Sequence, residues 1–513
     1  MKKKLALIIL DGFGEGKKNN ANAIHLAKTP FIDELEKKYP KCLLEPGGQS
    51  VGVLPKQFGG SDIGHTTIGT GQIIRKPIKI IYDAIQSGEF FENEKLNEAV
   101  DHAKKNNSNL HLFGIGSDSY IHAVTDYIFA LLDLCNKKNF PGNKVFLHLA
   151  LDGRDTAPDS GIYFLEKIQE QCKKNNCGHV ASIFGRILLD RDNIWERTKK
   201  VFDLCTQKNQ KFITDWKTYL EENYKKNIFD QEIPPVALGD ENGIFTRVGD
   251  NDAMINFCFR ADRERQITAA FTEKNFIEFE RQKIKNLHYT GFICYDPKLK
   301  NAHHAFLEDN TDICLSEILD QNKLRHFHIS GSEKFIFVTY NFNRCKNLNL
   351  PFETDEKMPQ TKIVKTFDQN PEMSEPNVTK RILEKLSENA PPEIFIVNYE
   401  NCDQVGHTGN LPAAIKATEC IDHALSKIIP KFLEKNYEIL ITADHGNADV
   451  MLDENNKPNT SHSPNKVPCF FISKKQKNLK MRDGCLADVA PTILDILDIE
   501  KPEVMTGKSL FLR

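Results

Sequence analysis

The sequence lacks a long apolar run, a strong net charge and any internal repeat. No stretch approaches the length of a membrane-spanning helix, so no membrane partner is expected. The formal net charge of −3 at pH 7 gives no bulk attraction to nucleic acid, so no nucleic-acid partner is expected either. With 40 % hydrophobic and 27 % charged residues, the composition is that of a soluble globular protein and not of a disordered chain.

The thirteen cysteines lack a pattern as well. They are scattered singly, and the nearest pair, Cys172 and Cys177, matches no metal or redox spacing. Free thiols in a reducing compartment are the simplest interpretation, so a cytoplasmic protein is expected. The N-terminal lysines and the apolar run after them resemble a secretion signal, but the run stops at Asp11 and no cleavage site follows it. A buried strand is expected there instead.

Short apolar runs rich in Ile, Val and Phe alternate with longer segments of helical period. This pattern is typical of an α/β fold, with a parallel sheet covered by helices on both faces. The expected strands form two sets, one near the chain ends (5–10, 335–340, 393–399, 438–443 and 467–473) and one in the middle (110–116, 145–151, 180–186, 253–259 and 289–295).

The 513 residues are too many for one ordinary core, and the two strand sets predict two α/β domains. One domain is discontinuous and comprises residues 1–76 and 311–513, and the other, residues 77–310, is inserted into it. Between the strands, residues 411–429 predict a helix that Asn410 caps, with Pro412 in its first turn.

One glycine-rich stretch, "FGGSDIGHTTIGTGQ" at 58–72, contains a single serine, Ser61. Glycines cost backbone entropy on folding, so they indicate a loop that something approaches closely, or a turn where Ser61 stands exposed. An ordinary surface turn is the alternative interpretation.

Acidic residues and histidines follow three expected strands of the discontinuous domain. Ligands collect beyond the carboxyl ends of strands in open α/β sheets. Each residue alone could be a helix cap or make one hydrogen bond, but their joint occurrence favours a metal site. Carboxylates with imidazoles suit Mn²⁺, Zn²⁺ or Fe²⁺ better than Ca²⁺, and the set is large enough for two ions. Its members are Asp11, Asp403, His407, Asp444, His445 and His462.

A two-metal site can clamp the attacking and leaving oxygens of a phosphoryl displacement. Ser61 is a weak nucleophile at its ordinary pKa, and a divalent cation can hold its oxygen as an alkoxide. The glycines around it would let a phosphoryl group come close. The resulting hypothesis is a metal-activated serine that carries phosphate covalently.

The inserted segment places arginines after successive strands. Any single arginine usually forms a surface salt bridge, but forked guanidinium donors at several strand ends favour a small anionic ligand. Asp155 could carry a proton between substrate oxygens. The candidate substrate residues are His122, Arg154, Asp155, Arg186, Arg191, Arg260 and Arg263.

Seven motifs together resemble the cofactor-independent phosphoglycerate mutases of the alkaline-phosphatase-like superfamily. They occur in that family's order along essentially the whole chain: "LIILDGFG", "GSDIGHTTIGTGQ", "LDGRDTAP", "FRADRERQ", "PEMS", "NYENCDQVGHTG" and "TADHGNAD". The resemblance implies a discontinuous phosphatase-like domain with an inserted transferase domain. It also implies interconversion of 3-phosphoglycerate and 2-phosphoglycerate in glycolysis and gluconeogenesis, through a phosphoserine.

The resemblance further implies roles for individual residues. Two divalent ions, in most members Mn²⁺, would be held by Asp403, His407 and His462, and by Asp11, Ser61, Asp444 and His445. Ser61 would be the nucleophile, and Lys334, just before an expected strand, would stabilise the transferring phosphoryl group. Asp155 would be the proton shuttle in a substrate cleft formed with His122, Arg154, Arg186, Arg191, Arg260 and Arg263. A monomer is expected, as for many members.

Some positions depart from the family pattern. Gly60 and Asp62 flank Ser61 where Asn and Glu are common, and Ser119-Tyr120 and Ala123-Val124 surround His122. Three alternatives stay open. The chain could be a phosphomonoesterase or a phosphopentomutase of the same superfamily, or a metabolite- or metal-binding protein without turnover.

Overall fold

The chain folds into two compact units, each described separately below. The structure, a computed structural model, describes residues 3–207, 211–309, 311–475 and 479–512. Unit 1 comprises Met1–Arg75 and Asp309–Arg513, and unit 2 comprises Lys76–Glu308. The expected fold class, a discontinuous α/β domain with a second α/β domain inserted, is confirmed. Residue 310, on which the expected second boundary falls, lies outside the described residues.

Unit 1 is built on an eight-stranded sheet. Its first five strands are parallel, but β16 runs antiparallel to β15, so the expectation of a wholly parallel sheet is wrong. A loop without a crossover helix joins β15 to β16, and such a return makes an antiparallel neighbour. The order is β13 (Glu353–Met358), β12 (His326–Gly331), β14 (Ile394–Tyr399), β1 (Leu5–Leu10), β15 (Glu438–Thr442), β16 (Val467–Ile472), β2 (Lys41–Glu45) and β18 (Gly484–Cys485).

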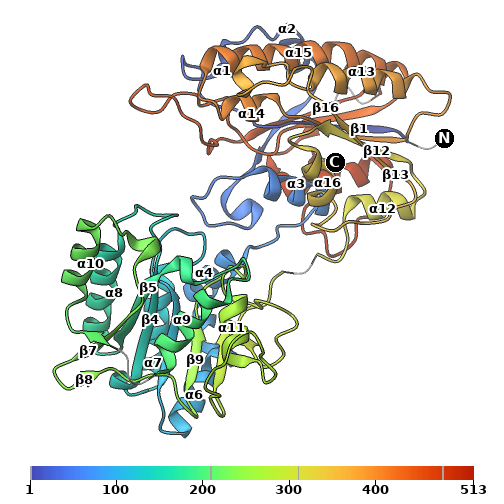
Figure 1. The fold of residues 1–513 in the computed structure, drawn as a ribbon. Coiled ribbons are helices and arrows are strands. Elements are labelled where there is room, and N and C mark those ends of the chain that lie inside the picture. The colour runs from blue at the N-terminus through green and yellow to red at the C-terminus, as the bar shows by residue number, and fades with distance from the viewer. Residues whose placement is uncertain (1–2, 208–210, 310, 476–478, 513) are drawn as a thin grey trace. The chain divides into compact units, whose positions relative to one another are not determined.

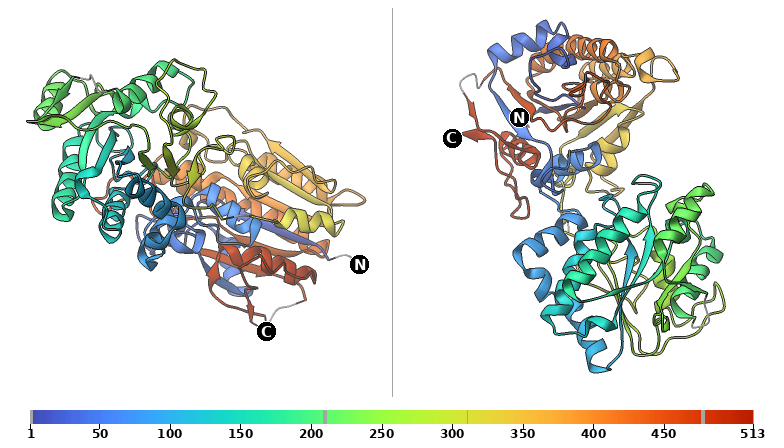
Figure 2. Two further views of the ribbon diagram at one scale, coloured as in Figure 1. Left: turned by 90° about the horizontal axis from the view of Figure 1, so that it is seen from below. Right: turned by 90° about the vertical axis from the view of Figure 1, so that its left-hand side faces the viewer.

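Helices cover both faces of this sheet (Figure 1). On one face lie α1 (Ala23–Leu26), α2 (Pro30–Lys38), α13 (Glu375–Leu386) and α15 (Leu411–Glu434), and on the other α3 (Ser61–Thr70), α12 (Leu315–Gln321) and α16 (Val489–Leu497). Helix α15 confirms the predicted helix, and the Asn410 side chain caps it by accepting from the Ala413 N–H at 3.2 Å. In Figure 2 the blue N-terminal and red C-terminal segments lie in this same unit.

The expected strand at 335–340 is wrong. Phe337–Asn341 is a π-helical segment, and the strand β12 precedes it. The run "FIFVTY" has strand propensity, but the segment packs as a helix against α3 and β12, and tertiary packing overrides propensity. Lys334 therefore precedes a helical segment and follows a strand.

Unit 2 contains a nine-stranded sheet, and the predicted central strands are present in it. Its path is β11 (His303–His304), β10 (His288–Gly291), β9 (Ala253–Asn256), β3 (Leu110–Ile115), β4 (Val145–Leu151), β5 (His179–Gly185), β7 (Val236–Asp240) and β6 (Phe212–Ile213), with β8 (Gly243–Ile244) beside β7. Strands β9 and β10 end earlier than expected. The Asn256 carbonyl still accepts from the Phe292 N–H at 2.8 Å, and just beyond the strand end the Cys258 carbonyl accepts from the Tyr295 hydroxyl at 2.6 Å.

The helices of unit 2 are α4 (Pro77–Ser87), α5 (Glu89–Glu92), α6 (Glu94–Lys105), α7 (Thr125–Lys137), α8 (Gly161–Asn175), α9 (Trp195–Thr206), α10 (Trp216–Lys225) and α11 (Arg265–Thr272). Helix α7 packs on α8, and α9 packs on α11. Among the described residues of both units, none of the helices combines the length and apolar character that a bilayer span requires.

Candidate active site

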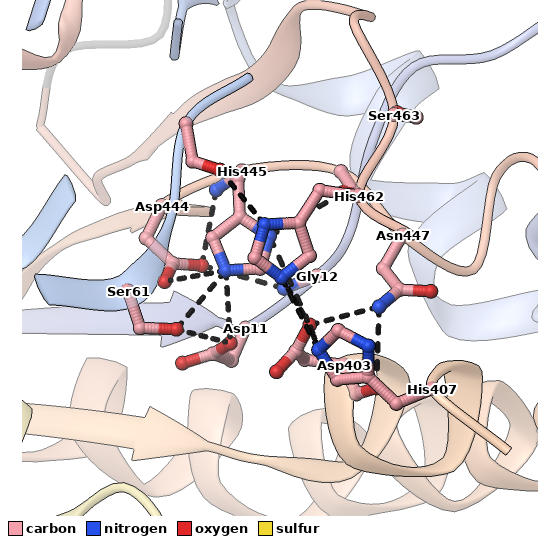
Figure 3. Close-up of polar contacts among 12 residues, drawn as sticks. Asp11, Gly12, Ser61, Asp403, His407, Asp444, His445, Asn447, His462 and Ser463 are labelled. Atoms are coloured by element: carbon pink, nitrogen blue, oxygen red, sulfur yellow. Dashed lines mark hydrogen bonds and ion pairs between the residues drawn. The ribbon is translucent and has the colours of Figure 1, made fainter. Parts of the chain in front are cut away.

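Three adjacent parallel strands of unit 1 end at one edge of the sheet, and each is followed by an aspartate. Asp11 comes directly after β1, Asp444 follows β15, and Asp403 lies in α14 (Asn401–Gly406) after β14. The strands are in register, with Leu10 opposite Tyr399, so their ends are level. The three carboxylates therefore converge (Figure 3).

The turn after β1 depends on Gly12. Its φ of +77° lies in the left-handed region, and a Cβ there would lie 2.6 Å from the backbone nitrogen of Asp403. Glycine alone permits this approach between the turn and α14. The Gly12 N–H also points to the Asp444 carboxylate, at 3.3 Å from Oδ1.

Ser61 is the first residue of helix α3 and is 7 % exposed, so of the two alternatives the turn with an exposed Ser61 is wrong. The glycines serve close packing of this helix. A Cβ at Gly64 would lie 2.9 Å from the Asp444 Cβ. Because helix N-termini favour anions, the position suits a group that carries negative charge.

The Ser61 hydroxyl is surrounded by candidate catalytic groups. Its Oγ lies 3.0 Å from His445 Nε2, 2.5 Å from Lys334 Nζ and 3.4 Å from Asp11 Oδ1. Lys334 also pairs with Asp403 at 2.6 Å and with Asp11 at 2.8 Å. Burial opposes the charge of Lys334, but these carboxylates raise its pKa, so the amine stays an ammonium.

Asp403, His407 and His462 form the first group of potential metal ligands. Asp403 Oδ1 lies 3.2 Å from His407 Nε2 and 3.3 Å from His462 Nε2, and the two ring nitrogens are 3.2 Å apart. Backbone carbonyls fix both rings through Nδ1, Thr460 O at 2.7 Å from His407 and Gly59 O at 2.7 Å from His462. Such outer partners orient imidazole ligands toward a metal.

Asp11, Asp444 and His445 form the second group, and all three are fully buried. His445 Nε2 lies 3.3 Å from Asp444 Oδ2 and 3.6 Å from Asp11 Oδ1. Within the described residues, Asp444 Oδ2 accepts no hydrogen bond. Burial, and then Asp444, raise the pKa of Asp11, while the Lys334 ammonium beside it acts in the opposite direction. A buried carboxylate pair with an unpartnered oxygen and imidazoles beside it fits divalent metal ions.

Sequence reasoning missed three residues that support these ligands. His65 Nδ1 contacts the Ser61 carbonyl at 2.9 Å, Asn398 donates to Asp11 Oδ2 at 2.8 Å, and Asn447 donates to Asp403 Oδ1 at 2.9 Å. A signal was present, because an asparagine inside a buried apolar strand needs a polar partner. Asn398 occupies such a position in β14.

In unit 2, His122, Asp155 and Arg186 come together beyond the strand ends. Arg186 is buried and donates to Asp155 Oδ2 at 2.6 Å and to Asp152. His122 Nε2 lies 3.9 Å from Asp155 Oδ2. Burial, and then the charge of Arg186, lower the pKa of His122 to about 4, so its imidazole is neutral at pH 7.

The other arginines gather around Asp262, which sequence reasoning also missed. Its Oδ2 lies 2.8 Å from Arg191 and 3.3 Å from Arg260. Arg263 is buried and donates to the Leu189 carbonyl at 2.9 Å. The Arg154 side chain is exposed in the loop of Asp155. Unit 2 thus concentrates cationic donors near one buried neutral imidazole, an arrangement that can bind a small anion.

Two protein-family models match the chain. The "BPG-independent PGAM N-terminus" model covers residues 81–297, and the "Type I phosphodiesterase / nucleotide pyrophosphatase" model covers residues 290–468. The first lies wholly within unit 2, and the second covers the end of unit 2 and part of unit 1. Both agree with the superfamily resemblance seen in the motifs.

Curated relatives match over their full length. The chain is 38 % identical to the 2,3-bisphosphoglycerate-independent phosphoglycerate mutase of Acetivibrio thermocellus, with 100 % of both chains covered. It is 37 % identical to the enzyme of that name from Clostridium kluyveri, with 99 % of each covered. A phosphoglycerate mutase of Leishmania mexicana, solved at low cobalt concentration, superposes with a TM-score of 0.63 at 26 % identity and covers 100 % of this chain and 98 % of its own.

Proposed function

The chain belongs to the family of 2,3-bisphosphoglycerate-independent phosphoglycerate mutases, and from this premise we propose that it interconverts 3-phosphoglycerate and 2-phosphoglycerate through a phosphoserine at Ser61. One observation carries the proposal. The Ser61 oxygen contacts an imidazole of a metal-ligand group, His445, and the ammonium of Lys334 at the same time. This is the environment that an activated nucleophile for phosphoryl transfer requires.

The reaction runs in two half-steps. In the first, Ser61 would react as an alkoxide whose proton has gone to solvent: its Oγ forms a bond to phosphorus, the bond between phosphorus and the C3 oxygen breaks, and protonated Asp155 gives its proton to that oxygen. In the second, Asp155 takes the proton of the C2 hydroxyl, the C2 oxygen bonds to phosphorus, the bond between phosphorus and Ser61 Oγ breaks, and Ser61 leaves as the alkoxide. A carboxyl group within hydrogen-bond reach can act as acid and then as base in this way. Lys334 neutralises charge on the transferring group in both half-steps.

The metal ions and their ligands are part of the proposal. Asp403, His407 and His462 would hold one Mn²⁺, and Asp11, Ser61, Asp444 and His445 would hold a second. When bound, the two cations would lower the pKa of the Ser61 hydroxyl and offset the charge of the phosphoryl oxygens. His445 faces both groups, since its Nδ1 lies 3.9 Å from Asp403 Oδ1 while its Nε2 faces Asp11 and Asp444.

Unit 2 would supply the substrate contacts. His122, Arg154, Arg186 and Arg191 would bind the carboxylate and hydroxyl groups of the glycerate, and Arg260 and Arg263 would bind the phosphate. Asp262 pairs with Arg191 and Arg260, and Asp155 pairs with Arg186. The nucleophile belongs to unit 1, and these arginines belong to unit 2.

We also propose a cytoplasmic monomer that acts on a small substrate, without nucleic-acid or membrane partners. The formal charge of −3 supports the absence of polyanionic partners. Each of the thirteen cysteines carries a free thiol, which supports a reducing compartment.

The test follows 3-phosphoglycerate by ³¹P NMR with wild-type protein, Ser61→Ala, and Ser387→Ala as a matched control on an exposed residue of unit 1. We expect 2-phosphoglycerate with the wild type and the control, and no turnover with a folded Ser61→Ala protein. Free phosphate in place of the isomer would favour a phosphomonoesterase. Normal turnover by Ser61→Ala would overturn the covalent mechanism.

A further inference from the structure

A third group of potential metal ligands lies in unit 1 at the start of strand β12. His326 and His328 alternate along β12, so both imidazoles lie on the same face of the sheet. Glu353 of the edge strand β13 is in register with His326. Ser61 and its neighbours lie at the opposite, carboxyl end of the sheet, and β12 alone spans roughly 16 Å from His326 to Gly331.

The three donor atoms face one another. His326 Nδ1 lies 3.0 Å from His328 Nε2, and Glu353 Oε2 lies 3.5 Å from the first nitrogen and 3.8 Å from the second. Ligands at zinc distances in a tetrahedral arrangement are separated by about 3.4 Å. The observed separations lie around this value, so one small cation can reach all three atoms with little side-chain movement.

Outer contacts hold two of the ligands in place. His328 Nδ1 contacts the Val338 carbonyl at 2.7 Å, and a proton on Nδ1 leaves the Nε2 lone pair of the neutral ring free to bind. Asn343 Nδ2 donates to Glu353 Oε1 at 2.8 Å, which leaves Oε2 facing the imidazoles. Metal ligands in proteins are oriented by hydrogen bonds of this kind, here to the Val338 carbonyl and from the Asn343 amide.

Among the described residues, no Lys or Arg forms an ion pair with Glu353, and the basic groups that face its Oε2 are the imidazoles of His326 and His328. Its side chain is 7 % exposed, and Oε2 accepts no hydrogen bond in the same part of the chain. A buried carboxylate oxygen without a hydrogen bond is costly, and a bound metal ion would remove this cost.

We propose that His326, His328 and Glu353 bind a divalent transition-metal cation of the zinc type, at a site separate from the proposed catalytic metals. Two imidazoles and one carboxylate suit Zn²⁺ and leave one coordination position open. Asp355 is paired with His328 in the sheet and lies on the same face of β13 as Glu353, two residues further along. Its carboxylate can fill the open coordination position.

The site has a structural consequence. β13 is the edge strand of its sheet, and its other side chains are at least partly exposed. A metal shared by β12 and β13 would tie this edge to the buried part of unit 1. Binding to the folded state alone stabilises it by mass action, so zinc is expected to raise the melting temperature.

The test counts zinc in the full chain. Wild-type protein, Glu353→Gln and Glu356→Gln are stripped with a chelator, loaded with excess Zn²⁺, passed through gel filtration and measured by mass spectrometry. Gln at 353 can still accept from Asn343, but it replaces a charged ligand oxygen. Glu356 is the matched control, because it lies on the same strand and pairs with Arg381 at 2.6 Å instead.

We expect Glu353→Gln to retain one zinc fewer per chain than the wild type, and Glu356→Gln to match the wild type. Because the comparison is between variants, it does not depend on how many ions the Ser61 site holds or on the proposed reaction. Equal zinc content in wild type and a folded Glu353→Gln protein would overturn the site. If the variant does not fold, anomalous scattering at the zinc edge from wild-type crystals decides. A peak among His326, His328 and Glu353 supports the proposal, and no peak there overturns it.

Discussion

The Lys334 ammonium lies 2.5 Å from the Ser61 hydroxyl oxygen, inside unit 1. Two carboxylates, Asp11 and Asp403, hold it there, and it is 3 % exposed. A fixed cation next to the nucleophile needs no reorganisation when charge develops on a transferring phosphoryl group. The contact joins residues 273 positions apart, so it depends on the whole of unit 1 being folded.

Replacing Lys334 with methionine should reduce kcat by about 10²–10³-fold, because removal of one preorganised donor from a transition state has this effect. The apolar side chain has similar length, so the cavity stays filled. Steady-state kinetics with 3-phosphoglycerate measure the loss, and Lys346→Met, at an exposed position, is the control. A Lys334→Met protein with kcat close to that of the wild type would show that the ammonium has no role in transfer.

The metal-ligand groups were predictable because they follow strands. An apolar run such as 5–10 identifies a buried strand, and Asp11 at its end then faces the sheet edge where ligands collect. Parallel register brings the ends of β1, β14 and β15 together, so Asp403 and Asp444 converge without any information beyond the pattern.

Other features depend on tertiary contacts that local pattern does not contain. Residues 61–70 form a helix although Gly64 and Gly69 lie within it, because Gly64 packs on Asp444 and the Gly69 position lies against the Phe342 carbonyl. The segment at 337–341 is helical despite its β-branched residues. Asp262 was missed because its role comes from two arginines that it holds, and nothing in its local sequence separates it from a surface acid.

Removal of divalent metal should abolish activity, and Mn²⁺ should restore it. Asp11 and Asp444 are fully buried, and the Asp444 Oδ2 atom accepts no hydrogen bond among the described residues, so a divalent cation there would satisfy a buried carboxylate oxygen. The melting temperature should fall with chelation and recover with metal, since ligands of the folded state stabilise it. Activity assays and thermal melts on protein with measured metal content test this. Undiminished activity in metal-free protein would contradict it.

Arg186 should matter for stability as well as for substrate binding. It is 2 % exposed and pairs with the buried Asp152 and with Asp155, so Arg186→Met leaves the buried Asp152 carboxylate uncompensated and should lower the free energy of unfolding by about 3–5 kcal/mol. Arg260→Met is the matched comparison, because Arg260 is half-exposed and its pair with Asp262 is worth less than about 1 kcal/mol. Denaturant unfolding should separate the two variants, although both should raise KM. Equal stability of the two proteins would contradict this account of Arg186.

Glu264 should make the stability of the protein fall as pH rises. It is fully buried in unit 2, where its Oε2 accepts from Asn256 at 2.7 Å, and burial raises its pKa to about 7 from an ordinary value of 4.5. Between these two values the folded state keeps a proton that the unfolded state has released. Stability should therefore be lost across this window, by about 3 kcal/mol in total, and the loss should level off above pH 7.

Glu264→Gln cannot ionise, so it should escape this loss whatever fixed cost the amide itself has. The melting temperature of Glu264→Gln minus that of the wild type should therefore increase from pH 5 to pH 8, because the wild-type carboxyl ionises over this range and the amide does not. Glu278→Gln, at an exposed position of the same unit, should follow the wild type at both pH values. Parallel pH profiles for the wild type and Glu264→Gln would show that Glu264 ionises alike in the folded and unfolded chains, contrary to its burial.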